Sequence, residues 1–141
     1  MKNESLDGIY TPLWLCYGLV PIVAGADKFL NLLTDWAKYL PGFAVKVIPV
    51  SPHTFMMGVG VIEIIAGLAV LTILPRLGAY VVALWLVLIA VSVIVAGFYD
   101  IAVRDLVMAL GALTLGNIAA LRGEPMLGRR VKPGIARPAI A

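Results

Sequence analysis

Four stretches of apolar residues, each long enough to cross a membrane as a helix, dominate this sequence. A helix that spans the hydrocarbon core of a bilayer needs about 20 mostly apolar residues. The stretches 11–33, 53–74, 76–99 and 101–121 meet that length, and no charged residue interrupts 77–98. Short connections favour antiparallel neighbours. The pattern therefore predicts an all-α fold, an integral membrane up-down four-helix bundle over residues 11–121.

The segments between and before these stretches are short, apart from one longer connection. We expect residues 34–52 to lie along the outer membrane surface or to fold over the end of the bundle as a lid, with Trp36 and Tyr39 in the interfacial belt. Residues 1–10 are polar and lack the basic stretch that precedes a signal-peptide core, so no removable signal is expected.

Composition agrees with a membrane location. Hydrophobic residues make up 62% of the chain and charged residues 13%, whereas soluble domains have about 45–50% apolar and about 25% charged residues. The net charge is +3, and the basic excess is concentrated in the last twenty residues, 122–141. This segment contains one acid, Glu124, and five bases: Arg122, Arg129, Arg130, Lys132 and Arg137.

This basic tail predicts the orientation. Basic flanks of membrane helices stay in the cytoplasm, and four crossings then place both termini there. We expect a multi-pass protein of the bacterial cytoplasmic (inner) membrane. Its tail should contact anionic membrane lipid, and we expect no nucleic acid partner.

Ionisable residues inside the apolar stretches are the main candidates for chemistry. Such groups cost about 2.5–3.5 kcal/mol each at the bilayer centre and therefore usually face partners inside a bundle. Asp27 and Lys28 close the first stretch, Glu63 lies in the middle of the second, and Arg104 and Asp105 open the fourth. Four of these five fall in the outer half of the membrane. They predict a polar pocket that opens outward, with Glu63 as its floor.

Four other polar residues are secondary candidates: Asn31, His53, Asp100 and Asn117. Asn31 lies one helical turn after Asp27, and Asp100 precedes Arg104 by four residues, a spacing that favours an ion pair on one helix. Asn117 lies in the cytoplasmic half, where it can bond across helices.

Structural alternatives to a ligand site remain open for these residues. Asp27 and Lys28 are also compatible with a local pair at the membrane boundary, and Arg104 and Asp105 with charges at a helix end. Glu63 is equally compatible with a hydrogen bond that locks two helices together.

Glycines accompany two of the candidates. Gly18 and Gly25 share a helix face with Lys28, and Gly60 and Gly67 share one with Glu63. Small residues at these spacings let neighbouring helix backbones approach closely.

Cysteine and histidine content limits the cofactors. The chain has one cysteine, Cys16, and one histidine, His53. It therefore has no internal disulfide, no Cys-x-x-Cys motif, no usual zinc ligand set and no paired haem ligands. We expect no intrinsic cofactor or metal. The sequence is compatible with a bound quinone or lipid.

The chain resembles the DoxX-like family of small bacterial four-helix membrane proteins over roughly residues 10–123. The resemblance is carried by Gly25-x-x-Lys28, by Glu63 with Gly67, and by Arg104 at the start of the fourth stretch. It implies that Lys28, Glu63 and Arg104 are intramembrane polar positions without an assigned catalytic role. Some members of the family are associated with quinone-linked sulfur oxidation or with oxidative-stress complexes.

Three functions follow as hypotheses. The first is a small subunit of a quinone-linked or respiratory membrane oxidoreductase, not catalytic alone, to which other membrane protein subunits supply electrons. The second is a non-catalytic structural accessory subunit of a larger membrane complex. The third is a small proton-coupled transporter, although the sequence shows no inverted repeat.

Overall fold

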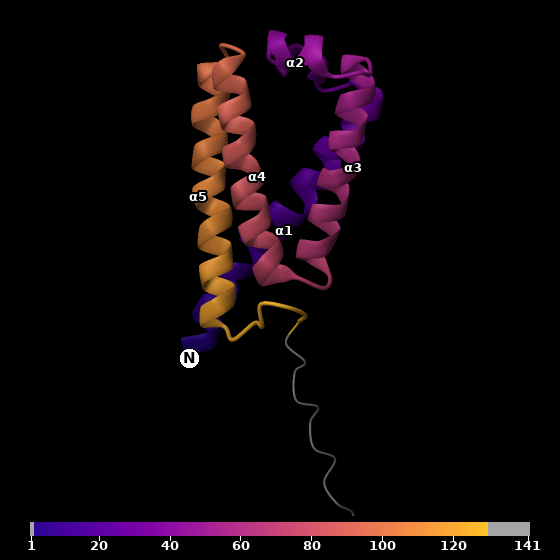
Figure 1. The fold of residues 1–141 in the computed structure, drawn as a ribbon. Coiled ribbons are helices and arrows are strands. Elements are labelled where there is room, and N and C mark those ends of the chain that lie inside the picture. The colour runs from indigo at the N-terminus through magenta and orange to yellow at the C-terminus, as the bar shows by residue number, and fades with distance from the viewer. Residues whose placement is uncertain (1, 130–141) are drawn as a thin grey trace, which may run out of the picture.

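The computed structural model describes residues 2–129, and every regular element in this range is a helix (Figure 1). Its elements are α1 (Lys2–Leu30), the 3₁₀ helix η1 (Trp36–Tyr39), α2 (Gly42–Val47), α3 (Pro52–Leu71), α4 (Pro75–Val95) and α5 (Tyr99–Leu121). The helices α1, α3, α4 and α5 are each long and apolar enough to cross a membrane, as the sequence predicted.

The first helix differs from the expected stretch at both ends. It begins at Lys2 and so includes the polar residues 2–10, and it ends at Leu30, before the expected residue 33. Asn31 ends it by adopting a φ of +50°, while its N–H donates to the Asp27 carbonyl over 2.6 Å. This left-handed conformation after a helix is one that asparagine tolerates.

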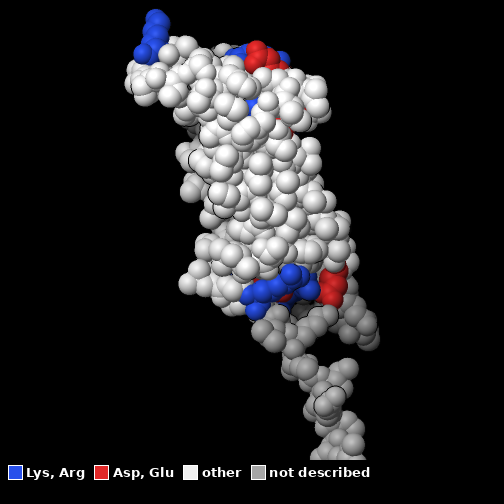
Figure 2. Space-filling view, turned by 90° about the vertical axis from the view of Figure 1, so that its right-hand side faces the viewer, with Lys and Arg blue, Asp and Glu red and all other residues white. Residues whose placement is uncertain are grey.

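The two ends of the molecule carry different features. Arg76, Arg122 and Arg129 lie at one end, the basic end, and η1 and α2 lie at the other, the cap end (Figure 1). Between them, the face drawn in Figure 2 shows a wide band without charged side chains. The tail residues Arg130, Lys132 and Arg137, for which contact with lipid was predicted, lie outside the described residues.

The long helices are arranged as two close pairs. α1 packs along α3, and α4 packs along α5, whereas α3 and α4 touch much less although a short turn joins them. Figure 1 shows the second pair separated from α3 toward the cap end, with α1 slanting behind from the foot of α5 to α3. A short connection therefore does not identify the closest neighbour of α3.

Glycines explain why α1 and α3 pack so closely. A Cβ atom on Gly25 would lie 2.5 Å from the Gly60 carbonyl oxygen, and one on Gly60 would meet the Gly25 carbonyl. Seven residues away on each helix, a Cβ on Gly67 would meet the Gly18 carbonyl. Backbone thus contacts backbone at two levels, which only residues without a side chain allow.

Hydrogen bonds from α1 reach both α3 and α5, and the bond to α5 connects the two pairs. The Tyr17 hydroxyl donates to the Met108 carbonyl of α5 over 2.7 Å, and the Trp14 indole N–H donates to the Val70 carbonyl of α3 over 2.9 Å. The larger apolar core surrounds these bonds, and a smaller one lies at the cap end around Ala90, Val93 and Ala102.

Candidate functional site

A buried ion pair joins α1 to α3. The Lys28 ammonium lies 2.5 Å from a carboxylate oxygen of Glu63, and the two side chains are only 4% and 8% exposed. Each residue follows a contact glycine by one helical turn, since Gly25 precedes Lys28 and Gly60 precedes Glu63. The close backbone approach therefore brings the two charged groups together, a pairing that intramembrane charges require.

Trp36 of η1 covers this pair from the cap end. The Lys28 nitrogen lies 3.8 Å from the centroid of the Trp36 ring, a cation–π contact. The Trp36 indole N–H donates to the Asp27 carboxylate over 2.8 Å, and that carboxylate also accepts the backbone N–H groups of Leu32 and Leu33. Asp27 thus fixes the chain as it leaves α1, while its neighbour Lys28 holds Glu63.

α5 contributes a buried carboxylate and an exposed cation. Asp105 is 4% exposed, and Lys28 is close enough to interact with it electrostatically. Arg104 donates to Asp105 over 3.3 Å, but its side chain is 64% exposed. Asp27, Lys28, Glu63 and Asp105 are therefore the buried charged residues of this region, and Arg104 lies at its edge.

The secondary candidates lie outside this group. Asn31 and His53 approach each other at 3.3 Å on the exposed surface, and Asp100 is exposed at the start of α5. The ion pair that Arg104 makes in the structure is with Asp105, in place of the i,i+4 pair expected with Asp100. The difference follows from the inward position of Asp105, which offers a less hydrated partner.

Asn117 belongs to the other end of α5. Its side-chain oxygen accepts the Tyr80 hydroxyl over 3.0 Å, so it bonds across helices to α4. Twelve residues separate it from Asp105, about 18 Å along a helix.

Trp85 of α4 is a site residue that the sequence analysis did not select. α3 and α4 meet where a Cβ on Gly78 would contact Val70. Seven residues along α4 from Gly78 is Trp85, and seven residues back along α3 from Val70 is Glu63. Because a seven-residue step covers the same length on both helices, Trp85 and Glu63 lie at a similar depth.

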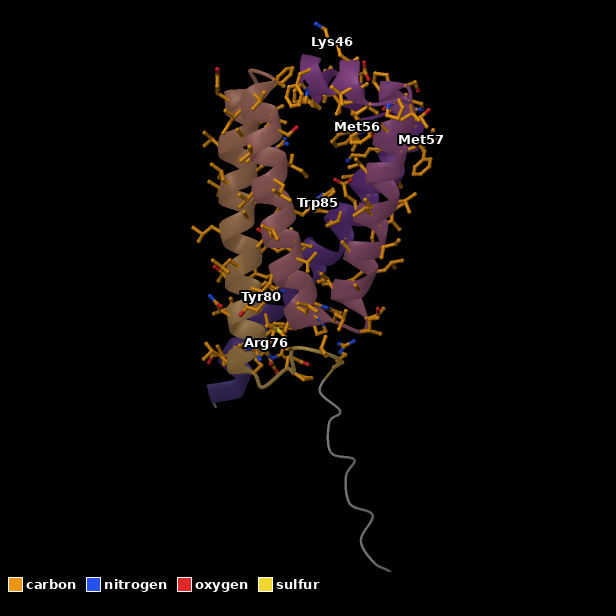
Figure 3. The ribbon with its side chains drawn as sticks, viewed as in Figure 1. Lys46, Met56, Met57, Arg76, Tyr80 and Trp85 are labelled. Carbon is orange, nitrogen blue, oxygen red and sulfur yellow. The ribbon has the colours of Figure 1, made fainter. Side chains whose placement is uncertain are left out.

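The Trp85 indole nitrogen is buried and has no hydrogen-bond partner among the described residues. Figure 3 shows its side chain directed from α4 into the space between the helix pairs. Buried N–H groups are nearly always paired. The signal available in the sequence was a tryptophan in the middle of a membrane span, where this side chain is uncommon compared with the interface.

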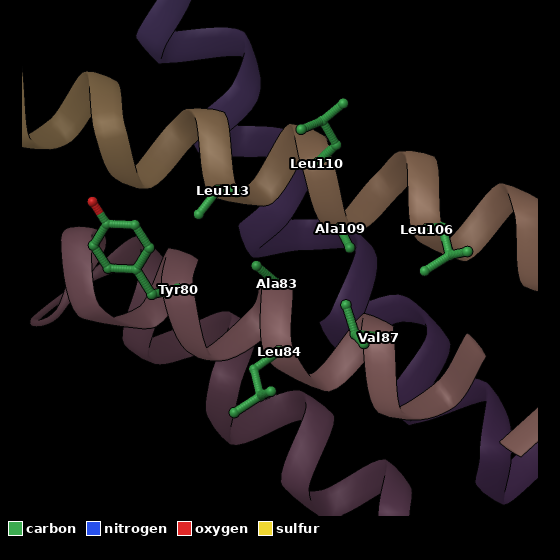
Figure 4. A pocket seen from close by; sticks show the side chains of 8 residues that line it. All are labelled: Tyr80, Ala83, Leu84, Val87, Leu106, Ala109, Leu110 and Leu113. Carbon is green, nitrogen blue, oxygen red and sulfur yellow. The ribbon is translucent and has the colours of Figure 1, made fainter. Parts of the chain in front are cut away.

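An apolar groove of the structure lies apart from this group of charged residues. It lies between α4 and α5, has a volume of about 450 Å³ and is open to the surroundings (Figure 4). Its lining is apolar apart from the Tyr80 hydroxyl: Tyr80, Ala83, Leu84, Val87, Leu106, Ala109, Leu110 and Leu113. The predicted polar residues thus meet in part, but away from this groove.

Comparison with known proteins adds no assignment: no family model, no curated protein and no solved structure matches the chain. The likeness to the DoxX-like family rests on the residues named for it. Within residues 2–129, no group of three His, Cys, Asp or Glu side chains is placed to hold a metal ion.

Replacing Trp36 is expected to release the segment that covers the ion pair. Trp36→Leu removes the ring over Lys28, a contact worth about 0.5–2 kcal/mol, and the hydrogen bond to Asp27. We expect faster cleavage between residues 31 and 51 in limited proteolysis. Phe43→Leu, at an exposed aromatic residue of α2 in the same segment, is the control. Equal cleavage rates in wild type and Trp36→Leu would contradict this role.

Proposed function

We propose that this chain is an integral membrane protein of the bacterial inner membrane, an up-down four-helix bundle with both termini in the cytoplasm. The proposal is supported by four helices of sufficient length and by the uncharged band between the two ends (Figure 2). Arg76, Arg122 and Arg129 lie at one end, and in the sequence the basic tail with Arg130, Lys132 and Arg137 follows them, whereas the cap end carries Lys38, Lys46 and Arg104. The positive-inside rule therefore favours the cytoplasm at the end with the tail.

Within that membrane, the chain acts as a small subunit of a quinone-linked oxidoreductase assembly. The observation that carries this function is the buried Trp85 N–H without a partner, at the depth of the Lys28–Glu63 pair. A quinone head has two carbonyl oxygens that accept hydrogen bonds. The indole N–H of Trp85 and the ammonium of Lys28, which has three donors, fit such a group.

Each polar residue then has a defined task. Trp85 and Lys28 orient the head group by donating hydrogen bonds, and Trp36 excludes water from the cap side. Glu63 and Asp105 are the carboxylates positioned to hold a proton near it. The quinone, when bound, supplies the redox chemistry, and partner subunits supply the electrons.

A structural accessory role is the second candidate function, and a specific observation favours it. Glu63 is already neutralised by Lys28, and Asp105 by Arg104. The Lys28–Glu63 pair, which joins α1 to α3, holds these two helices in register without any ligand. In that case the exposed apolar faces of α4 and α5 bind other subunits of the complex, and the Trp85 N–H has no ligand.

Gentle purification at native expression level tests the proposed function. Mass spectrometry of the purified complex is expected to find redox subunits together with a lipid-soluble quinone. A complex that contains neither would contradict the oxidoreductase assignment.

Trp85→Phe separates the two candidates, because it keeps an aromatic ring and removes only the N–H. We expect the quinone content to fall severalfold while the subunits remain assembled. Tyr99→Phe, which removes an exposed hydroxyl, is the control. Unchanged quinone content in Trp85→Phe would support the accessory role instead.

A further inference from the structure

The groove between α4 and α5 begins beside the basic end. Ala83 and Ala109 form its floor, and the leucines at its sides are exposed, among them Leu84 at 62% and Leu110 at 64% (Figure 4). Small residues facing each other leave a channel between the larger side chains. In a bilayer, such an apolar channel is filled by hydrocarbon.

A polar pair lies at one end of this groove. Tyr80 lines the groove and donates its hydroxyl to the side-chain oxygen of Asn117. This bond leaves the two N–H donors of Asn117 for another acceptor, and no described residue takes them. The groove thus ends, toward the basic end, in hydrogen-bond donors.

Arg76 stands one helical turn below Tyr80, at the start of α4 (Figure 3). Its guanidinium donates to the Glu124 backbone carbonyl over 3.3 Å, and its Nε is buried without a hydrogen-bond partner among residues 2–129. Within the same range, no carboxylate forms an ion pair with Arg76. A positive charge therefore stands at the membrane boundary, directly below an apolar channel.

We infer that this groove is the binding site of one anionic phospholipid. An acyl chain lies between α4 and α5, and Arg76 binds the phosphate. Asn117 donates to the ester or phosphate oxygens, and Tyr80 marks the boundary between chain and head group. The order of groups along the helices is that of a phospholipid: hydrocarbon, then hydrogen-bond acceptors, then negative charge. The inference rests on the proposed membrane location but not on quinone binding.

Native mass spectrometry tests the lipid-binding site. The protein is taken from bilayers that contain phosphatidylglycerol and phosphatidylcholine in equal amounts. We expect one retained phosphatidylglycerol per chain. Arg76→Gln should reduce its retention by about fivefold, the factor expected for one basic residue near an anionic surface. Lys46→Gln removes the same charge from the cap end and should leave retention unchanged.

Two further measurements separate the groove from the charge alone. Ala83→Phe fills the floor of the groove and should also release the lipid; if this variant does not fold, Asn117→Leu takes its place. Glycerol phosphate, which has the head-group charge but no acyl chain, should not compete. Equal retention of both lipids, or retention unaffected by Arg76→Gln, would overturn the inference. Since the protein would still fractionate with membranes in that case, the proposed membrane location would stand.

Discussion

Lys28→Met is expected to lower the free energy of unfolding by about 3–5 kcal/mol, because it leaves the Glu63 carboxylate buried without its cation. Both side chains are almost completely buried, so water cannot replace the lost partner. The same substitution removes the charge that lies against the Trp36 ring. Lys46→Met, which removes an exposed lysine of α2, should change the unfolding free energy by less than about 0.5 kcal/mol.

The double variant Lys28→Met/Glu63→Leu shows whether stability requires the ion pair itself or only the absence of an unpaired buried charge. Replacing both partners of a buried ion pair by apolar residues of similar size is often neutral or stabilising. We therefore expect the double variant to regain most of the stability that Lys28→Met loses. Equilibrium unfolding in detergent micelles measures all three variants. A double variant that is less stable than Lys28→Met would contradict this account of the pair.

Gly60→Ala is the second change with a large expected effect, a loss of about 1–3 kcal/mol from forcing α1 and α3 apart. The added Cβ would meet the Gly25 carbonyl oxygen, and it would also lie 3.2 Å from the Lys28 Cβ. Backbone atoms cannot turn aside as side chains do. The helices must separate, and this also lengthens the Lys28–Glu63 contact.

Gly58→Ala in the same helix is the matched control, since a Cβ there meets nothing within 4 Å. Alanine favours a helix over glycine by about 0.8–1.0 kcal/mol, so the control should be as stable as wild type or more stable. Thermal unfolding followed by circular dichroism compares the two variants. If Gly60→Ala were as stable as Gly58→Ala, the close packing of α1 on α3 would be wrong.

Local patterns in the sequence located most of the secondary structure. The stretches 53–74, 76–99 and 101–121 contain α3, α4 and α5 with small differences at their ends. These helices follow from length and apolar composition, which depend only on neighbouring residues. The polar start of α1 was missed because that criterion reads apolar content, and a polar segment can continue a helix beyond the membrane.

The candidate site was less accessible to such reasoning. Lys28 and Glu63 were selected because charge inside an apolar stretch is rare, and the structure brings them together. Arg104 was selected by the same rule but is mostly exposed, because its direction depends on how α5 is rotated against α4. Trp85 and Trp36 were not assigned to the polar group, since an uncharged side chain gives no such signal.

The sequence by itself determined that this protein is all-helical, with four helices able to cross a membrane and with rare charges on three of them. Only the tertiary structure decided which helices pair, that Asp27 bonds the connection after α1 while Lys28 pairs with Glu63, and that an apolar groove lies between α4 and α5. The physical reason is that helix formation depends on residues within a few turns. Pairing depends on contacts between residues far apart in the chain, such as Gly25 and Gly60, whose fit appears only when both backbones are placed in space.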